Sequence, residues 1–117
     1  MQTQKQLQKN NTMKKIYYQL KISPEYGASP IWYKATEDDF FDNLELTTAN
    51  FKNSLELLER IQSWDNKFQS TFNKEYPPES GFLIDKERNE YLKELDEIKN
   101  TLRGFSKKEI IISINNI

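Results

Sequence analysis

Two stretches in the second half of the chain carry apolar residues at the three- and four-residue steps of an amphipathic helix. Tyr76-Pro77-Pro78 separates them, because proline disfavours the helical conformation in the residue before it. We expect Thr47 or Thr48 to cap the first helix and Asp85 to begin the second. Both apolar stripes must be buried, so the rest of the chain has to supply a surface for them. The stripes are Phe51, Leu55, Leu58, Ile61, Trp64, Phe68 and Phe72, and then Tyr91, Leu92, Leu95, Ile98 and Leu102.

Three segments with the pattern of β-strands can supply that surface. Residues 14–23 alternate, so that one face carries Ile16, Tyr18, Leu20 and Ile22. Residues 31–35 form a shorter strand, and Pro30 before it favours an edge position or the first residue of a strand. Residues 109–114 contain three consecutive isoleucines, which indicate burial on both faces and a central position in the sheet.

These elements predict an α+β fold with the order β-β-α-α-β. A small sheet of three strands, or slightly more, would pack against two long helices. The acidic segment between the second strand and the first helix, residues 36–46, fits either a short helix or an ordered loop. An edge strand at residues 30–35 would leave room for pairing with another chain, and the oligomeric state stays open.

The length of 117 residues is that of one domain. We expect residues 13–117 to form a single α+β domain. Residues 1–12 are polar and rich in Gln and Asn, which predicts a disordered or dispensable N-terminal extension. The chain contains neither an apolar secretory leader nor the roughly 20 consecutive apolar residues of a membrane helix. We therefore expect a cytoplasmic protein that does not contact the membrane.

The chain contains no Cys and no His. Thiolate nucleophiles, disulfides and zinc–thiolate sites are thereby excluded, and the commonest general base and metal ligand are missing. This composition predicts a protein that is not an enzyme, with no catalytic residues and no cofactor. A small enzyme that uses only carboxylates and Tyr is the remaining catalytic alternative.

One acidic motif matches a known metal-binding pattern. Asp38-Asp39-Phe40-Phe41-Asp42 has the DDxxD spacing with which some isoprenoid enzymes bind magnesium. The chain is too short for such an enzyme, and no second acidic motif lies on another long helix. Three acids within five positions also occur often by chance. We predict no metal site here.

The charges of the chain are unevenly distributed, although the formal net charge is only −1. Residues 1–35 contain six Lys and one Glu, a net charge of +5, whereas residues 36–65 contain eight acids and two basic residues, a net charge of −6. An acidic patch of this kind could steer a basic partner, or it could be an ordinary solvated surface. Glu56 can pair with Lys52 or Arg60 along a helix. The unpaired acids Glu37, Asp38, Asp39, Asp42 and Glu45 are therefore the candidate partner-binding residues.

The two tryptophans differ in their predicted surroundings. Trp64 lies on the apolar stripe of the first helix, which favours a position in the core. Trp32 alternates with Ile31 and Tyr33 in a short strand, so it is a candidate for either the core or an interface. Nucleic-acid binding is not predicted, because the Lys-rich beginning of the chain is followed by the acidic segment and Arg is scarce.

Several groups of residues occur in an order and spacing found in one known family. Tyr26 and then Ser29-Pro30-Ile31-Trp32-Tyr33 precede the acidic segment. A helix with Leu55, Leu58, Ile61, Trp64-Asp65 and Phe68 follows, and then Ser80-Gly81-Phe82, an acid-rich helix and a final strand. Over residues 14–114 the chain resembles small immunity proteins of bacterial contact-dependent growth inhibition and related polymorphic toxin systems. It departs from that pattern at Lys34-Ala35-Thr36-Glu37, where such proteins often have an acidic-Gly turn.

The resemblance implies a protein that binds the C-terminal toxin domain of a delivered effector and blocks its active site. A basic nuclease is one candidate toxin, because an acidic surface can imitate nucleic acid. The expected contact residues are Trp32, Glu37, Asp38, Asp39, Asp42 and Glu45. The alternative is a phage- or plasmid-borne adaptor that regulates another host protein.

Overall fold

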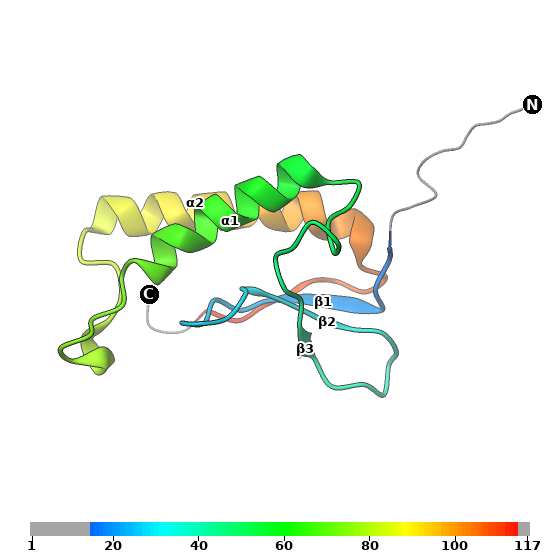
Figure 1. Cartoon of the computed structure of the whole chain (residues 1–117), viewed down its shortest axis with the longest axis horizontal. Coiled ribbons are helices and arrows are strands. Elements are labelled where there is room, and N and C mark those ends of the chain that lie inside the picture. The colour runs from blue at the N-terminus through cyan, green and yellow to red at the C-terminus, as the bar shows by residue number, and fades with distance from the viewer. Residues whose placement is uncertain (1–14, 115–117) are drawn as a thin grey trace, which may run out of the picture.

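The computed structural model describes residues 15–114. Within this range two long helices cover one face of a four-stranded mixed sheet (Figure 1). The predicted α+β fold is therefore confirmed. The expectation of a disordered or dispensable extension at residues 1–12 lies outside the described residues. The elements are β1 (Gln19–Ile22), β2 (Ile31–Lys34), β3 (Asp42–Asn43), α1 (Leu55–Gln69), α2 (Asp85–Leu102) and β4 (Ile111–Ile112), with 3₁₀ turns η3 (Pro77–Glu79) and η4 (Arg103–Phe105).

The strands of the sheet lie in the order β3-β2-β1-β4. β1 and β2 are antiparallel, with Leu20 opposite Tyr33 and Ile22 opposite Ile31. β4 pairs with β1 in parallel and stands at the edge, so the predicted central position of the last strand was wrong. The physical reason is that only alternate isoleucines of this run are covered. Ile110 is buried, whereas the side chain of Ile111 is 40% exposed.

The acidic segment contributes a strand that the sequence did not predict. β3 lies within residues 36–46, where we expected a short helix or a loop, and it pairs Asn43 with Trp32 and Asp42 with Tyr33. β2 is thus flanked on both sides, and the expectation of an exposed edge at residues 30–35 was wrong. Pro30 lies one residue before β2, which begins at Ile31, so it is neither the first residue of the strand nor in an edge strand, the two positions that were predicted.

The strand at the beginning of the domain is shorter than predicted. Leu20 and Ile22 are buried as expected, but Ile16 is exposed and Tyr17 is buried in its place. The Tyr17 ring lies 5.0 Å from the Tyr33 ring, and its backbone N–H donates to the carbonyl of Phe105 at 2.9 Å. The predicted face of four alternating residues therefore holds only for Leu20 and Ile22, because the chain bends before β1.

Helix α1 begins at Leu55 and not at the predicted caps Thr47 or Thr48. Residues 48–53 form turns, and the hydroxyl of Thr47 accepts the N–H of Asn50 at 3.3 Å. Phe51 is nevertheless buried in the core, so the apolar pattern was correct while the helix start was not. Helix α2 begins at Asp85 as predicted.

The core lies between the helices and the sheet, with Trp64 and Tyr91 at its centre. Their rings stack with centroids 4.5 Å apart, and the indole N–H of Trp64 donates to the carbonyl of Tyr91 at 3.0 Å. The predicted core position of Trp64 is confirmed. On the helix surface Arg60 pairs with Glu94 and Glu97, and Lys67 pairs with Glu94. No helix in residues 15–114 is long and apolar enough to cross a membrane.

Candidate functional site

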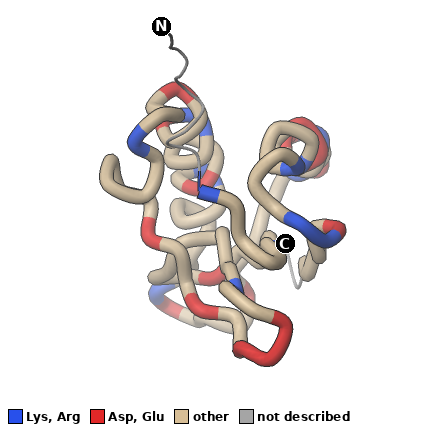
Figure 2. The backbone as a smooth tube through the Cα atoms, turned by 90° about the vertical axis from the view of Figure 1, so that its right-hand side faces the viewer, with Lys and Arg blue, Asp and Glu red and all other residues tan. Residues whose placement is uncertain are grey.

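The loop between β2 and β3, residues 35–41, presents the acidic segment to solvent. It extends from the sheet on the side away from the helices (Figure 1), and it forms the red stretch at the bottom of Figure 2. Glu37, Asp38 and Asp39 are all exposed, and so is Asp42 at the beginning of β3. The structure thus brings four of the five predicted acidic residues into one continuous, solvated segment, which we call the acidic loop (residues 35–42).

Hydrogen bonds within the acidic loop hold it in a tight turn. The N–H of Thr36 donates to Oδ2 of Asp39 at 3.0 Å, and the N–H of Asp39 donates to the carbonyl of Thr36 at 3.2 Å. Nζ of Lys34 donates to the carbonyl of Glu37 at 3.4 Å. Asp39 therefore shapes the loop, while no hydrogen bond or ion pair within the described residues engages the carboxylates of Glu37 and Asp38.

Phe40, directly after the turn formed by Thr36–Asp39, is the functional candidate that the sequence analysis missed. Its side chain is 90% exposed, with Asp39 before it in the chain and Asp42 two residues after it. Exposure alone does not identify a site, because Leu83 is 91% exposed as well. Phe40 is a candidate because it lies within the acidic loop, and aromatic anchors often carry binding energy at interfaces. The available signal was the Asp-Phe-Phe-Asp run itself, in which one Phe must point outward if the other packs.

Glu45 lies apart from the acidic loop, beyond β3. It is exposed and lines a shallow hollow of about 320 Å³ together with Asn43, Asp65 and Gln69. The side chain of Asn43 bonds within the chain, because its amide donates a hydrogen bond to the carbonyl of Ser29 at 2.8 Å. Among the predicted acidic residues, Glu45 is therefore the one that the fold separates from the others.

Trp32 is half-buried and lies on the face of the sheet that points away from the helices. Leu20 and Ile22 of β1 face the helices, so Lys21 between them, and Trp32 opposite Lys21, face the other way. The indole N–H of Trp32 donates to the carbonyl of Ser23 at 3.0 Å, and Nζ of Lys21 lies 5.6 Å from the ring centroid. Trp32 is thus held in place beside a cation, with part of its ring open to solvent.

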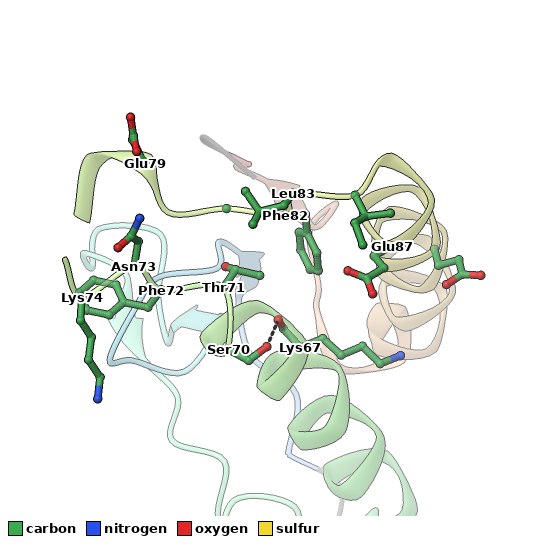
Figure 3. Close-up of a pocket in the computed structure, with 13 residues that line it drawn as sticks. Lys67, Ser70, Thr71, Phe72, Asn73, Lys74, Glu79, Phe82, Leu83 and Glu87 are labelled. Atoms are coloured by element: carbon green, nitrogen blue, oxygen red, sulfur yellow. Dashed lines mark hydrogen bonds between the residues drawn. The ribbon is translucent and has the colours of Figure 1, made fainter. Parts of the chain in front are cut away.

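A larger cavity than the hollow beside Glu45 lies between the end of α1 and the start of α2 (Figure 3). It has a volume of about 720 Å³, and both apolar and charged side chains line it, including Phe72, Leu83, Lys67 and Glu87. Its polar groups serve local turns: Ser70 donates to the carbonyl of Lys67 at 2.8 Å, as Figure 3 shows, and the N–H of Asn73 donates to Ser80 at 2.7 Å. Nothing in this lining pairs a nucleophile with a base.

Burial raises the pKa of three side chains, Tyr17, Asp65 and Tyr91, and they do not form a catalytic arrangement. Burial raises the pKa of the Asp65 carboxyl, and a hydrogen bond from Gln69 opposes that shift. Burial also raises the pKa of the Tyr91 phenol, and the nearby charges of Asp65 and Tyr26 add to it. Within residues 15–114, no group of three acidic side chains is placed to hold a metal ion. The arrangement can bind a partner through charge and aromatic surface.

The fold and the site together define a small α+β binding protein. Residues 18–110 match the model of the family described as Serratia CdiI immunity protein-like. Because the match covers most of the chain, the protein belongs to this family of contact-dependent growth inhibition immunity proteins, as the resemblance over residues 14–114 had predicted. No curated protein matches the chain.

Membership in this family determines the general role of the protein. CdiI immunity proteins are not enzymes, and a member binds and neutralises its cognate CdiA toxin domain inside the target cell. The family assignment favours this role over that of a phage- or plasmid-borne adaptor.

Proposed function

We propose that this protein neutralises its cognate toxin by laying the acidic loop into the active site of the toxin domain, in the cytoplasm of the target cell. The exposed carboxylates of Glu37, Asp38 and Asp42 supply the charge, and Phe40 supplies an apolar anchor. The exposure of these side chains supports the proposal most directly, because none of them contributes to the core. Trp32 lies on β2 next to β3, whereas Glu45 lies apart from the acidic loop, in the hollow beside Asp65 and Gln69 of α1.

A basic nuclease is the toxin class that fits this loop best. A nuclease presents cationic side chains to the phosphates of its substrate, and closely spaced carboxylates can occupy the same positions. The loop charge would mainly raise the association rate, while Phe40 would slow dissociation once it is buried. Both effects act on one short segment, so they can be tested by local substitutions.

The charge contribution is tested by reversing Glu37, Asp38 and Asp42 to Lys together. Asp39 is left unchanged because it accepts a hydrogen bond that holds the turn. The matched control changes Glu56, Glu59 and Asp96 to Lys. These residues are exposed on the helices, and their reversal changes the net charge of the chain by the same amount. The ligand is the cognate toxin domain, which we expect to be encoded directly upstream, and association is measured by stopped flow or biolayer interferometry.

We expect the loop variant to associate at least about tenfold more slowly at low salt, with the difference shrinking in 0.5 M salt. The helix control should stay within about twofold of the original protein, and circular dichroism should show that both variants fold. Phe40→Ser should accelerate dissociation without changing the melting temperature. Unchanged rates in the loop variant would refute the assignment of the acidic loop as the contact.

The occlusion mechanism needs a separate test on the activity of the toxin. If the acidic loop fills the active site, nucleic acid and the immunity protein compete, and inhibition weakens as the substrate concentration rises. Inhibition that is independent of substrate would place the contact outside the active site. A toxin domain without nuclease activity would refute the nuclease assignment while leaving neutralisation intact.

A further inference from the structure

The face of the sheet that points away from the helices carries three lysines set among three aromatic rings. No helix covers this face (Figure 1). The residues are Lys21 on β1, Lys34 on β2 and Lys108 before β4, with Tyr18, Trp32 and Phe41, and we call them the Lys-aromatic face.

Each lysine of this face lies over aromatic rings. Nζ of Lys21 is 4.9 Å from the centroid of the Phe41 ring and 5.6 Å from that of Trp32. Nζ of Lys34 is 5.1 Å from Phe41 and 5.8 Å from Tyr18, and Nζ of Lys108 is also 5.8 Å from Tyr18. Cation–π contacts of about 0.5–1 kcal/mol each hold exposed ammonium groups loosely over a ring. The arrangement keeps the cations at the surface with apolar rings beneath them.

No carboxylate neutralises these lysines within residues 15–114. The ion pairs of the described chain join residues of α1 and α2 and leave Lys21, Lys34 and Lys108 without an acidic partner. This holds although Glu37 and Asp38 follow Lys34 by only a few residues. The face therefore offers uncompensated positive charge to a molecule that binds from outside.

The Lys-aromatic face and the acidic loop adjoin each other and have opposite charge. Phe41 joins them, because it belongs to the loop and its ring lies near both Lys21 and Lys34. A molecule that covers both surfaces must present basic groups to the loop and carboxylates with apolar groups to the sheet. A folded protein domain can carry both signs side by side. A nucleic acid cannot, because its phosphates would meet the carboxylates of the loop within a Debye length of about 10 Å.

We propose that the Lys-aromatic face is a second contact surface for the same toxin domain, and that it receives an acidic segment of that domain. The carboxylates of the segment pair with Lys21, Lys34 and Lys108, and its apolar side chains cover Trp32 and Phe41. This inference rests on the proposed function for its partner, and it adds the chemistry that the partner must present. The toxin contact thus has a basic part against the loop and an acidic part against the sheet.

The direct test is zero-length cross-linking of the native complex with a carbodiimide. The reagent activates a carboxylate, and the amine of a Lys in contact with it displaces the urea leaving group to form an amide. The probe is the same cognate toxin domain, and mass spectrometry identifies the linked peptides. We expect links from Lys21, Lys34 or Lys108 to Asp or Glu of the toxin domain. Links that come only from lysines of α2, such as Lys86 and Lys93, would overturn the proposal.

Substitutions give an independent measurement. Lys21→Glu with Lys108→Glu reverses two cations of the face and leaves Lys34, which bonds the loop, in place. The control is Lys86→Glu with Lys93→Glu, two exposed residues of α2 that cause the same change in net charge. We expect the face variant to bind the toxin domain at least about tenfold more weakly and the control to bind within about twofold. Lys21→Gln with Lys108→Gln, a milder pair, serves if the Glu variant fails to fold by circular dichroism.

The outcomes separate this inference from the proposed function. Weak binding of the acidic-loop variant with normal binding of the face variant leaves the loop contact intact and overturns the second surface. Weak binding of the face variant with normal binding of the loop variant supports the second surface and removes the loop contact. Binding of a labelled single-stranded RNA to the free protein, lost in the face variant, would also overturn the proposal, because the face would then serve nucleic acid.

Discussion

Tyr91 in the core and Tyr26, which is partly buried and packs against the core, carry hydroxyl groups in different surroundings. Removing the two hydroxyls should change the free energy of unfolding in opposite directions. Tyr91 is only 1% exposed, and its phenolic oxygen has no hydrogen-bond partner among residues 15–114. The oxygen of Tyr26, by contrast, lies 2.6 Å from Oγ1 of Thr71, with which it shares a hydrogen bond. The two rings lie in the same aromatic cluster around Phe68.

The magnitudes follow from these surroundings. A buried hydroxyl without a partner costs about 1–3 kcal/mol, because it has lost its hydrogen bonds to water. Tyr91→Phe removes that cost and keeps the ring that stacks on Trp64. The void left by one oxygen destabilises the variant by a few tenths of a kcal/mol, at about 24 cal/mol per Å³. We expect a net gain of about 1 kcal/mol and a melting temperature about 4 °C higher. Tyr26→Phe should instead lose about 0.5–1.5 kcal/mol with its hydrogen bond.

The assay is urea unfolding followed by circular dichroism at 222 nm, because Trp fluorescence would itself change next to an altered Tyr91. Equal slopes of free energy against urea should show that both variants unfold in one cooperative step. The difference in sign between the two variants is the decisive result. If Tyr91→Phe lowers the free energy of unfolding by 1 kcal/mol or more, the hydroxyl has a partner and the reasoning is wrong.

Two further predictions concern a buried acid and the orientation of α1. Burial raises the pKa of Asp65, so the unfolded chain releases this proton at a lower pH than the folded chain does. The tighter binding of this proton by the folded chain stabilises the fold. The stabilisation is complete below the ordinary Asp pKa of about 3.9 and is lost as the pH rises through the raised pKa of the folded state. Asp65→Asn should therefore gain stability relative to the original protein between pH 4 and pH 7 in urea unfolding, and a constant difference would contradict the assignment. Ile61 is fully buried and Leu55 is 50% exposed, although both belong to the predicted stripe of the first helix. Ile61→Ala should cost about 2–4 kcal/mol and Leu55→Ala less than about 1 kcal/mol, and comparable losses in thermal unfolding would mean that α1 is rotated from the orientation described.

The local pattern of residues was sufficient to predict features that depend on one helix or one turn alone. The step of three and four residues placed Trp64 in the core, and Pro77-Pro78 together with Asp85 correctly separated the two helices. The same pattern misplaced the start of α1, because Phe51 reaches the core from a turn as well as it would from a helix. The spacing of apolar residues predicts which side chains are buried. It does not determine the backbone conformation, because several conformations can bury the same side chains.

The candidate site was predictable only in part for the same reason. The acids of the 37–42 segment were visible as an unpaired charged run, and their exposure follows from their chemistry. The exposure of Phe40 and the cover that Lys21 gives to Phe41 depend on how the loop leaves the sheet. Neither residue could be assigned to a surface until β3 had been placed beside β2.

The sequence by itself determined the α+β class, the two helices, the buried Trp64, the exposed acidic segment and the family of immunity proteins. Only the tertiary structure decided that β4 stands at the edge, that β3 exists, and that lysines from three distant segments share one face with aromatic rings. The physical reason is the range of the interactions. Helix periodicity and charge act between neighbours along the chain, whereas the order of the sheet depends on pairings such as Lys21 with Ile111, between residues far apart in sequence.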